Sequence, residues 1–176
     1  FRYTTPFGVE CEDNVDVTDF SSVLQGLVEF ELYFESWDGS GYEPTLTFEM
    51  TKGTPDYAYT NVDEIWFDIY PFGDYANQQP VPEVDYIFTE NTEAAKLKLV
   101  TSGHNWSSGS NNTNNTGNAA EFYEATHNIK VNGTKVFDQH LWRQCNPNPA
   151  GCQPQNGTWT YHRSGWCPGS IAMVWD

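Results

Sequence analysis

The chain has 176 residues, of which 38% are hydrophobic, 16% aromatic and 18% charged. A chain of this length can bury a sizeable core, and this composition excludes an intrinsically disordered protein. Its 24 acidic and 8 basic residues give a net charge of −16, which repels nucleic acid and anionic membrane surfaces. No apolar run approaches the ~20 residues that a membrane-spanning helix needs. Because Phe1-Arg2-Tyr3-Thr4 shows no initiator Met and no signal-peptide pattern, we expect a processed or excised piece.

The N-terminal third predicts a short helical turn and then strands. Residues 17–24 read as one helical turn, capped by Thr18 or Asp19, and alternating apolar residues at 28–34 and 45–50 predict half-buried strands. A turn-rich break at 53–57 places a domain boundary near residue 60. Because these few strands cannot close a core by themselves, residues 1–60 are expected either to pack on the rest of the chain or to belong to a domain whose beginning is missing. We favour the second alternative.

The remaining residues, 61–176, predict further strands and one long loop. Alternation at 96–100 and 128–131 predicts strands, and Asn132-Gly133 is a strong signal for a two-residue hairpin turn. Residues 107–118 are only Ser, Gly, Asn and Thr, which predicts an exposed loop. That loop is either a lid beside Glu121 or a tolerated surface insertion. The strand pattern as a whole favours an all-β sandwich or barrel.

The cysteines and glycosylation sequons favour a secreted protein. Four cysteines form an even set without Cys-x-x-Cys spacing, which favours disulfides over a zinc or redox site. Five Asn-x-Ser/Thr sequons fit hydrophilic loops in the secretory pathway, although a chain so rich in Asn and Thr contains some by chance. The cysteines are Cys11, Cys145, Cys152 and Cys167, and the sequons begin at Asn105, Asn111, Asn114, Asn132 and Asn156.

Two glutamates and a C-terminal group of aromatic and arginine residues could carry chemistry. Glu35 lies near Trp37, and Glu121 lies between Ala and Phe, where burial would raise a carboxyl pKa, but either could be a solvated residue. The C-terminal group could stack on sugar rings and hydrogen-bond amide oxygens, or its tryptophans could fill the core. This group consists of Trp142, Arg143, Trp159, Arg163 and Trp166.

Metal and serine-hydrolase chemistry find little support in the sequence. The histidines are scattered and include no His-x-His pair, which argues against copper. The Gly-x-Ser-x-Gly elbow of a Ser-His-Asp hydrolase is absent. We expect no metal and no cofactor. The four histidines are His104, His127, His140 and His162.

A collinear set of motifs resembles the peptide-N-glycosidase F family. The most specific motif is Arg163-Ser164-Gly165-Trp166-Cys167-Pro168-Gly169, an Arg-x-Gly-Trp-Cys-Pro-Gly pattern. The resemblance covers nearly the whole chain and also rests on 16–20, 35–37, 53–57, 120–121, 126–129, 141–142, Cys145 and 157–159. It implies an antiparallel jelly-roll sandwich fold, in which residues 1–60 end a first jelly-roll and residues 61–176 form most of a second.

The resemblance also implies an activity and the residues that carry it. Family members hydrolyse the amide between an N-glycan and asparagine in a cleft between two jelly-rolls, without a metal. The matching positions imply catalytic roles for Glu121, Glu35 and Arg163. They imply substrate-binding roles for Trp37, Trp166, Trp106 and His104, of which Trp106 would replace an aromatic residue that is Ser102 here. The expected partner is an N-glycan or N-glycoprotein.

Departures from the family pattern shape two hypotheses. The principal catalytic aspartate of the family precedes anything that matches Phe1, so we expect this chain alone to be inactive and prone to aggregate. The family cysteines that flank the essential glutamate are Ala119 and Tyr123 here. Cys145 and Cys167 match a family disulfide, which leaves Cys11 and Cys152 to pair with each other. The leading hypothesis is an N-glycan amidase, and the alternative is a non-catalytic secreted carbohydrate-binding or adhesive module.

Overall fold

The computed structural model describes residues 3–4, 12–31, 42–57, 59–70, 81–104, 120–149 and 157–175. The chain divides into two compact units: residues 1–13 together with 68–176, and residues 14–67. Each unit is described separately below. The predicted domains 1–60 and 61–176 stay a prediction.

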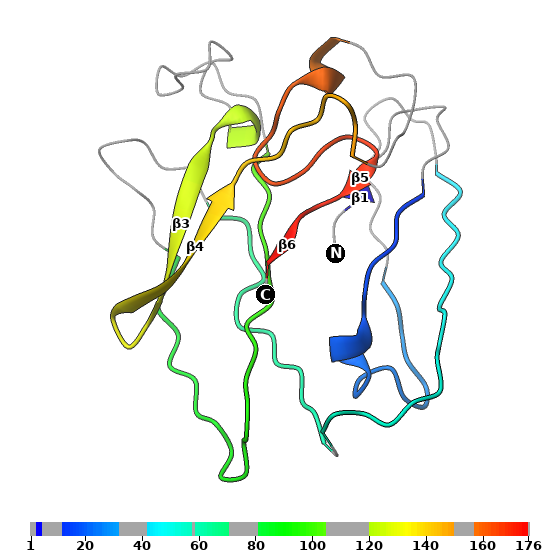
Figure 1. Cartoon of the computed structure of the whole chain (residues 1–176), viewed down its shortest axis with the longest axis vertical. Helices are drawn as coiled ribbons and strands as arrows, with labels where there is room; N and C mark the ends of the chain where they lie inside the picture. The colour runs from blue at the N-terminus through cyan, green and yellow to red at the C-terminus, as the bar shows by residue number, and fades with distance from the viewer. Residues whose placement is uncertain are drawn as a thin grey trace. The chain divides into compact units, whose positions relative to one another are not determined.

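Strands in the described residues pair only in the antiparallel sense, as an all-β chain predicts. Within those residues they form three two-stranded sheets, β1 with β5, β2 with β6, and β3 with β4 (Figure 1). The strands are β1 (Tyr3–Thr4), β2 (Leu99–Val100), β3 (Ala125–Val131), β4 (Thr134–Leu141), β5 (Ser170–Ile171) and β6 (Val174–Trp175). Three short 3-10 helices complete the set: η1 (Thr18–Phe20), η2 (Ala120–Phe122) and η3 (Gly157–Thr160).

The β3–β4 hairpin confirms the turn that the sequence predicts. Asn132 and Gly133 both have positive φ, 49° and 74°, as the two-residue turn of a twisted hairpin requires. Val131 therefore pairs with Thr134, and the ladder runs back to the pair Ala125 and Leu141. Among the described strands these two are the longest, with 7 and 8 residues, and Figure 1 shows them side by side. The segment that follows β4 contacts the candidate site through the bridge of Arg143 to Arg163 and the disulfide of Cys145 to Cys167.

The unit of residues 14–67 differs from its predicted strands. Alternation at 28–34 and 45–50 predicts strands, but the structure gives residues 45–50 and the described residues 28–31 no ladder partner. Phe30 and Phe48 nevertheless pack with ring centroids 4.9 Å apart. Alternation identifies an apolar face but does not supply a hydrogen-bonding partner, which a strand needs. The predicted helical turn is present as η1, but its N-cap residue is Val17, not Thr18 or Asp19, and makes no side-chain cap bond. The Asp16 carboxylate accepts a hydrogen bond from Thr18 N.

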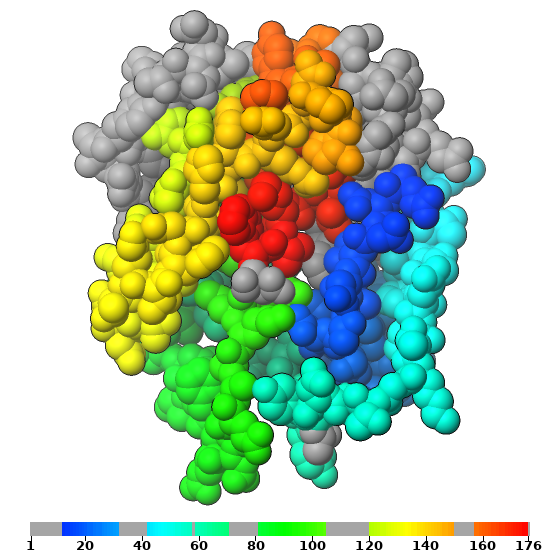
Figure 2. All heavy atoms as spheres, in the orientation of Figure 1, coloured from blue at the N-terminus to red at the C-terminus, as the bar shows by residue number. Residues whose placement is uncertain are grey.

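The core of the other unit lies around η2, β4 and the C-terminal segment. Its buried apolar side chains include Phe122, Leu141, Trp166 and Ala172. The ring centroids of Phe137 in β4 and Trp175 in β6 lie 6.1 Å apart, and Figure 2 shows the two segments, in yellow and red, side by side. Polar groups are buried here as well, namely Gln139, Asn148, Arg163, Ser164 and Ser170. Among the described residues, no helix is long and apolar enough to cross a membrane.

Candidate functional site

The site is built around Glu121, which lies in the short helix η2. Its neighbour Phe122 is buried, which anchors the turn in the core, while the Glu121 side chain keeps 19% of its surface exposed. Glu121 Oε1 accepts a hydrogen bond of 2.8 Å from Arg163 Nε. A carboxylate held at one oxygen and partly open to solvent can still bind water or a ligand through the other oxygen.

Arg163 holds this carboxylate with a guanidinium that is itself fixed in place. A β-bridge to Arg143 positions its backbone, with reciprocal N–H···O bonds of 2.8 and 3.0 Å. Nη1 donates to the carbonyls of Tyr161 (2.7 Å) and Trp159 (3.3 Å), and Nη2 donates to the carbonyl of Thr158 (2.8 Å). The side chain is only 4% exposed. Because the fork is planar and held at three nitrogens, Arg163 cannot turn away from Glu121 without breaking several bonds.

The electrostatics of the pair follow from its burial. Burial lowers the pKa of the Arg163 guanidinium, while the hydrogen bond and the negative charge of Glu121 raise it. The guanidinium carbon also lies 5.0 Å from the ring centroids of both Phe122 and Trp166, a distance at which aromatic rings attract cations. Arginine remains protonated in proteins, so the site holds a fixed positive charge beside a carboxylate.

A stacked pair of rings lies next to the ion pair. The His104 imidazole stacks on the Trp166 indole, with centroids 4.7 Å apart and planes inclined by 28°. Trp166 Nε1 donates to the Gly103 carbonyl at 2.8 Å, and Ser102 Oγ lies 2.8 Å from His104 Nε2. Trp166 is only 7% exposed, so its indole mainly supports the neighbouring side chains.

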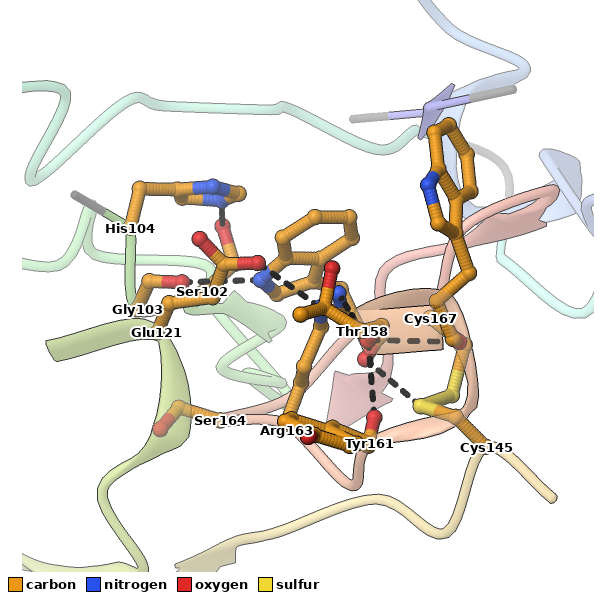
Figure 3. Close-up of polar contacts among 12 residues, drawn as sticks. Ser102, Gly103, His104, Glu121, Cys145, Thr158, Tyr161, Arg163, Ser164 and Cys167 are labelled. Atoms are coloured by element: carbon orange, nitrogen blue, oxygen red, sulfur yellow. Dashed lines mark hydrogen bonds and ion pairs between the residues drawn. A yellow bond between two sulfur atoms is a disulfide. The ribbon is translucent and has the colours of Figure 1, made fainter. Parts of the chain in front are cut away.

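Three segments that are distant in sequence therefore meet at one place: residues 102–104, 120–123 and 158–167. Figure 3 shows the Glu121 carboxylate and the Arg163 side chain pointing toward each other, with Ser102 and His104 on the Glu121 side. Of the predicted site residues, the structure brings together Glu121, Arg163, Trp166 and His104.

The disulfide that the resemblance implies is present beside this site. Cys145 and Cys167 are bonded at 2.03 Å and are separated by 22 positions in the sequence. The bond joins the segment after β4 to the motif that contains Arg163 and Trp166 (Figure 3). It thus fixes the C-terminal side of the site to the hairpin.

The other predicted residues lie either outside the described residues or away from the ion pair of Glu121 and Arg163. Asn132 is exposed at the β3–β4 turn. Trp142 packs edge-on against His162, with ring centroids 6.1 Å apart. Among the described residues, no three His, Cys, Asp or Glu side chains form a group that could hold a metal ion. The predicted residues outside the described ranges are Glu35, Trp37, Trp106, Cys11, Cys152, Asn105, Asn111, Asn114 and Asn156.

Several contacts of the site were not predicted. The carbonyls of Thr158, Trp159 and Tyr161 hold Arg163, but a backbone acceptor leaves no mark in a sequence. Ser164 is 1% exposed and bonds to the Glu121 segment. Its position inside the Arg-x-Gly-Trp motif was the signal that could have identified it.

Comparison with known proteins relates this geometry to a described family. A family model described as "Peptide-N-glycosidase F, C terminal" matches residues 72–176. The chain is 33% identical over 180 residues to peptide-N(4)-(N-acetyl-beta-D-glucosaminyl)asparagine amidase F of Elizabethkingia miricola. That alignment covers 96% of this chain and 49% of the relative, so the chain spans about half the length of the curated protein it matches. No solved structure matches the chain.

Proposed function

Because this chain belongs to the peptide-N-glycosidase F family, we propose that its full-length protein is an amidase that releases N-glycans from asparagine. In this reaction water adds to the side-chain carbonyl of the glycosylated asparagine and the C–N bond breaks. The water oxygen stays on the new aspartate, and the nitrogen leaves with the glycan as a glycosylamine. The substrate is thus an N-glycoprotein or N-glycopeptide.

The partly buried ion pair of Glu121 and Arg163 is the observation that carries this proposal. Amide hydrolysis needs a group that moves protons and a positive group near the developing oxyanion. Glu121 supplies a carboxylate whose Oε1 is held at 2.8 Å by Arg163, which leaves Oε2 to meet water or substrate. Arg163 supplies a positive charge that its carbonyl partners keep in place. We assign Glu121 to proton transfer and Arg163 to stabilising charge.

The remaining predicted residues complete the proposed site. Glu35 is proposed as a third catalytic residue, and Trp37, Trp106 and His104 are proposed to form the surface that meets the sugar. Trp166, which is only 7% exposed, is proposed to contribute to substrate binding through its stack with His104. Imidazole and indole rings offer both stacking faces and N–H donors, which suits a saccharide. The proposed fold is the jelly-roll sandwich of the family, divided near residue 60.

The proposed location is outside the cell. The Cys145–Cys167 disulfide persists in oxidising compartments and is rare in a reducing cytosol. The second proposed disulfide joins Cys11 to Cys152, and the exposed Asn132 is the described sequon that a glycan could reach.

The test measures isotope incorporation into an N-glycopeptide. A denatured glycopeptide is incubated in heavy-oxygen water with the full-length product and, separately, with these 176 residues. Mass spectrometry should find aspartate that carries one heavy oxygen in the full-length reaction. The chain spans about half of its relative, so we expect no conversion by the 176 residues alone.

Matched glutamine variants separate the site from general effects of charge. Glu121→Gln in the full-length product should lower the rate about a hundredfold or more, because proton transfer contributes that much in such reactions. Glu124 lies three positions after Glu121, and Glu124→Gln removes an exposed carboxylate that pairs with His140. This variant should leave the rate unchanged. If the unmodified full-length product converts no glycopeptide, the amidase is excluded and the carbohydrate-binding module becomes the better hypothesis.

A further inference from the structure

The short helix that carries Glu121 contains one long hydrogen bond, from Tyr123 to Ala120, and receives further bonds from a distant segment. η2 has only three residues, Ala120–Phe122, and its own closing bond, from Tyr123 N to Ala120 O, is 3.5 Å long. Good N–H···O bonds measure about 2.9 Å, so this one contributes little. A single isolated turn is also unfavourable on entropic grounds. Contacts from elsewhere in the chain therefore help to hold Glu121 in position.

Ser164 supplies these contacts. Its N–H donates to the Glu121 carbonyl at 2.9 Å, and its hydroxyl donates to the Ala120 carbonyl at 2.8 Å. The same hydroxyl also reaches the carbonyl of Tyr123, so its single proton is shared between the two ends of the turn. Ser164 is 1% exposed, and no solvent competes for these bonds.

Arg163 and Ser164 are consecutive, and they hold opposite ends of the same glutamate. Arg163 binds the carboxylate, while Ser164 binds the main chain on both sides of it. The Ser164 carbonyl in turn accepts a 2.9 Å bond from Gly103 N, which brings in the segment of His104. We propose that Ser164 is a positioning residue for Glu121, which sets where its carboxylate lies relative to Arg163 and substrate. This inference rests on the amidase proposed above.

Ser170 provides a matched control for a test of this role. It is also 1% exposed and follows the same motif, but its hydroxyl makes only a 3.3 Å contact with the adjacent Ile171 carbonyl. In the full-length protein, Ser164→Ala should lower kcat about tenfold to a hundredfold, because small misplacements of a reacting group have effects of that size. KM should change less than about twofold, since the substrate surface is untouched. Ser170→Ala should leave both constants unchanged.

A second readout does not depend on activity. Hydrogen–deuterium exchange of the backbone amides in residues 120–124 should become faster in Ser164→Ala and stay as in the unmodified protein in Ser170→Ala. Unchanged exchange in Ser164→Ala, or an unchanged kcat in an active protein, overturns the positioning role. An equal kcat loss in both variants overturns it too. If the unmodified protein shows no amidase activity, the proposed function fails, and the exchange result alone decides whether Ser164 holds Glu121.

Ser164→Cys serves if the alanine variant does not fold. The thiol keeps a polar group at this position but is larger and a weaker donor than the hydroxyl, so it weakens these bonds without leaving a cavity. The same loss of kcat and the same faster exchange are expected, and normal values of both contradict the inference.

Discussion

Arg163 shows how one buried side chain can serve both stability and function. Its guanidinium makes four hydrogen bonds, one to Glu121 and three to backbone carbonyls. Removing one member of a buried ion pair leaves an uncompensated charge, whereas exposed pairs contribute little. The same chain offers both cases, because Lys135 and Asp138 also form a 2.8 Å pair but are 52% and 46% exposed.

Arg163→Lys should therefore destabilise the protein although it conserves the charge. A single ammonium cannot reach Glu121 and three carbonyls that are arranged around a planar fork, so buried acceptors lose their donors. We expect the free energy of unfolding to fall by about 2–4 kcal/mol, measured by urea denaturation.

The exposed pair gives the control for this substitution. Lys135→Met removes a salt bridge of the same length from the surface of β4 and should change the free energy of unfolding by less than about 1 kcal/mol. Equal effects of the two substitutions would show that the carbonyl contacts of Arg163 contribute nothing.

At the scale of elements, the site depends on how closely three segments approach each other. A Cβ added at Gly103 would lie 2.2 Å from the Ala120 carbonyl oxygen and 2.7 Å from the Ser164 Cβ. Both are closer than such atoms can approach, so the segments could not keep their hydrogen bonds. Only glycine allows residues 102–104 to lie against η2 at this point.

Gly103→Ala should disrupt the site as well as the fold. We expect the free energy of unfolding to fall by about 1–3 kcal/mol, as for other overpacked sites, and the isotope-labelling activity of the full-length product to fall with it. Gly53→Ala is the control, since nothing lies within 4 Å of its added Cβ. Thermal denaturation of both variants measures the difference, and similar melting temperatures would contradict the close approach at Gly103.

At the scale of the molecule, the Cys145–Cys167 disulfide joins the hairpin to the C-terminal motif. It closes a loop of 22 positions, for which the chain-entropy estimate gives a stabilisation of ~3 kcal/mol. The double variant Cys145→Ala, Cys167→Ala should lower the midpoint of urea unfolding by a corresponding amount. Addition of a reductant should shift the unfolding midpoint of the unmodified protein toward that of the variant. The variant has no Cys145–Cys167 bond, so the reductant cannot lower its midpoint by breaking this bond.

Local patterns in the sequence predicted the β3–β4 hairpin of the protein, although alternation at 28–34 and 45–50 did not predict strands correctly in the described residues. Asn132-Gly133 predicts its turn because few residue pairs accept two consecutive positive φ angles. Alternation of apolar and polar residues predicts β3 because successive side chains of a strand point to opposite faces of the sheet. The resemblance identified Glu121, Arg163 and the disulfide partners, but not their geometry.

The tertiary structure alone decided which distant groups meet. Arg163 lies 42 positions from Glu121, and its three carbonyl partners carry no side-chain signal. β2 pairs with β6, and β1 with β5, through contacts across much of the chain, whereas the alternating residues 28–31 and 45–50 have no ladder partner. A short sequence pattern encodes backbone conformation and the apolar face of a segment. Partners between distant segments depend on how the whole chain packs, and Ser164 gained its contacts with Glu121 in that way.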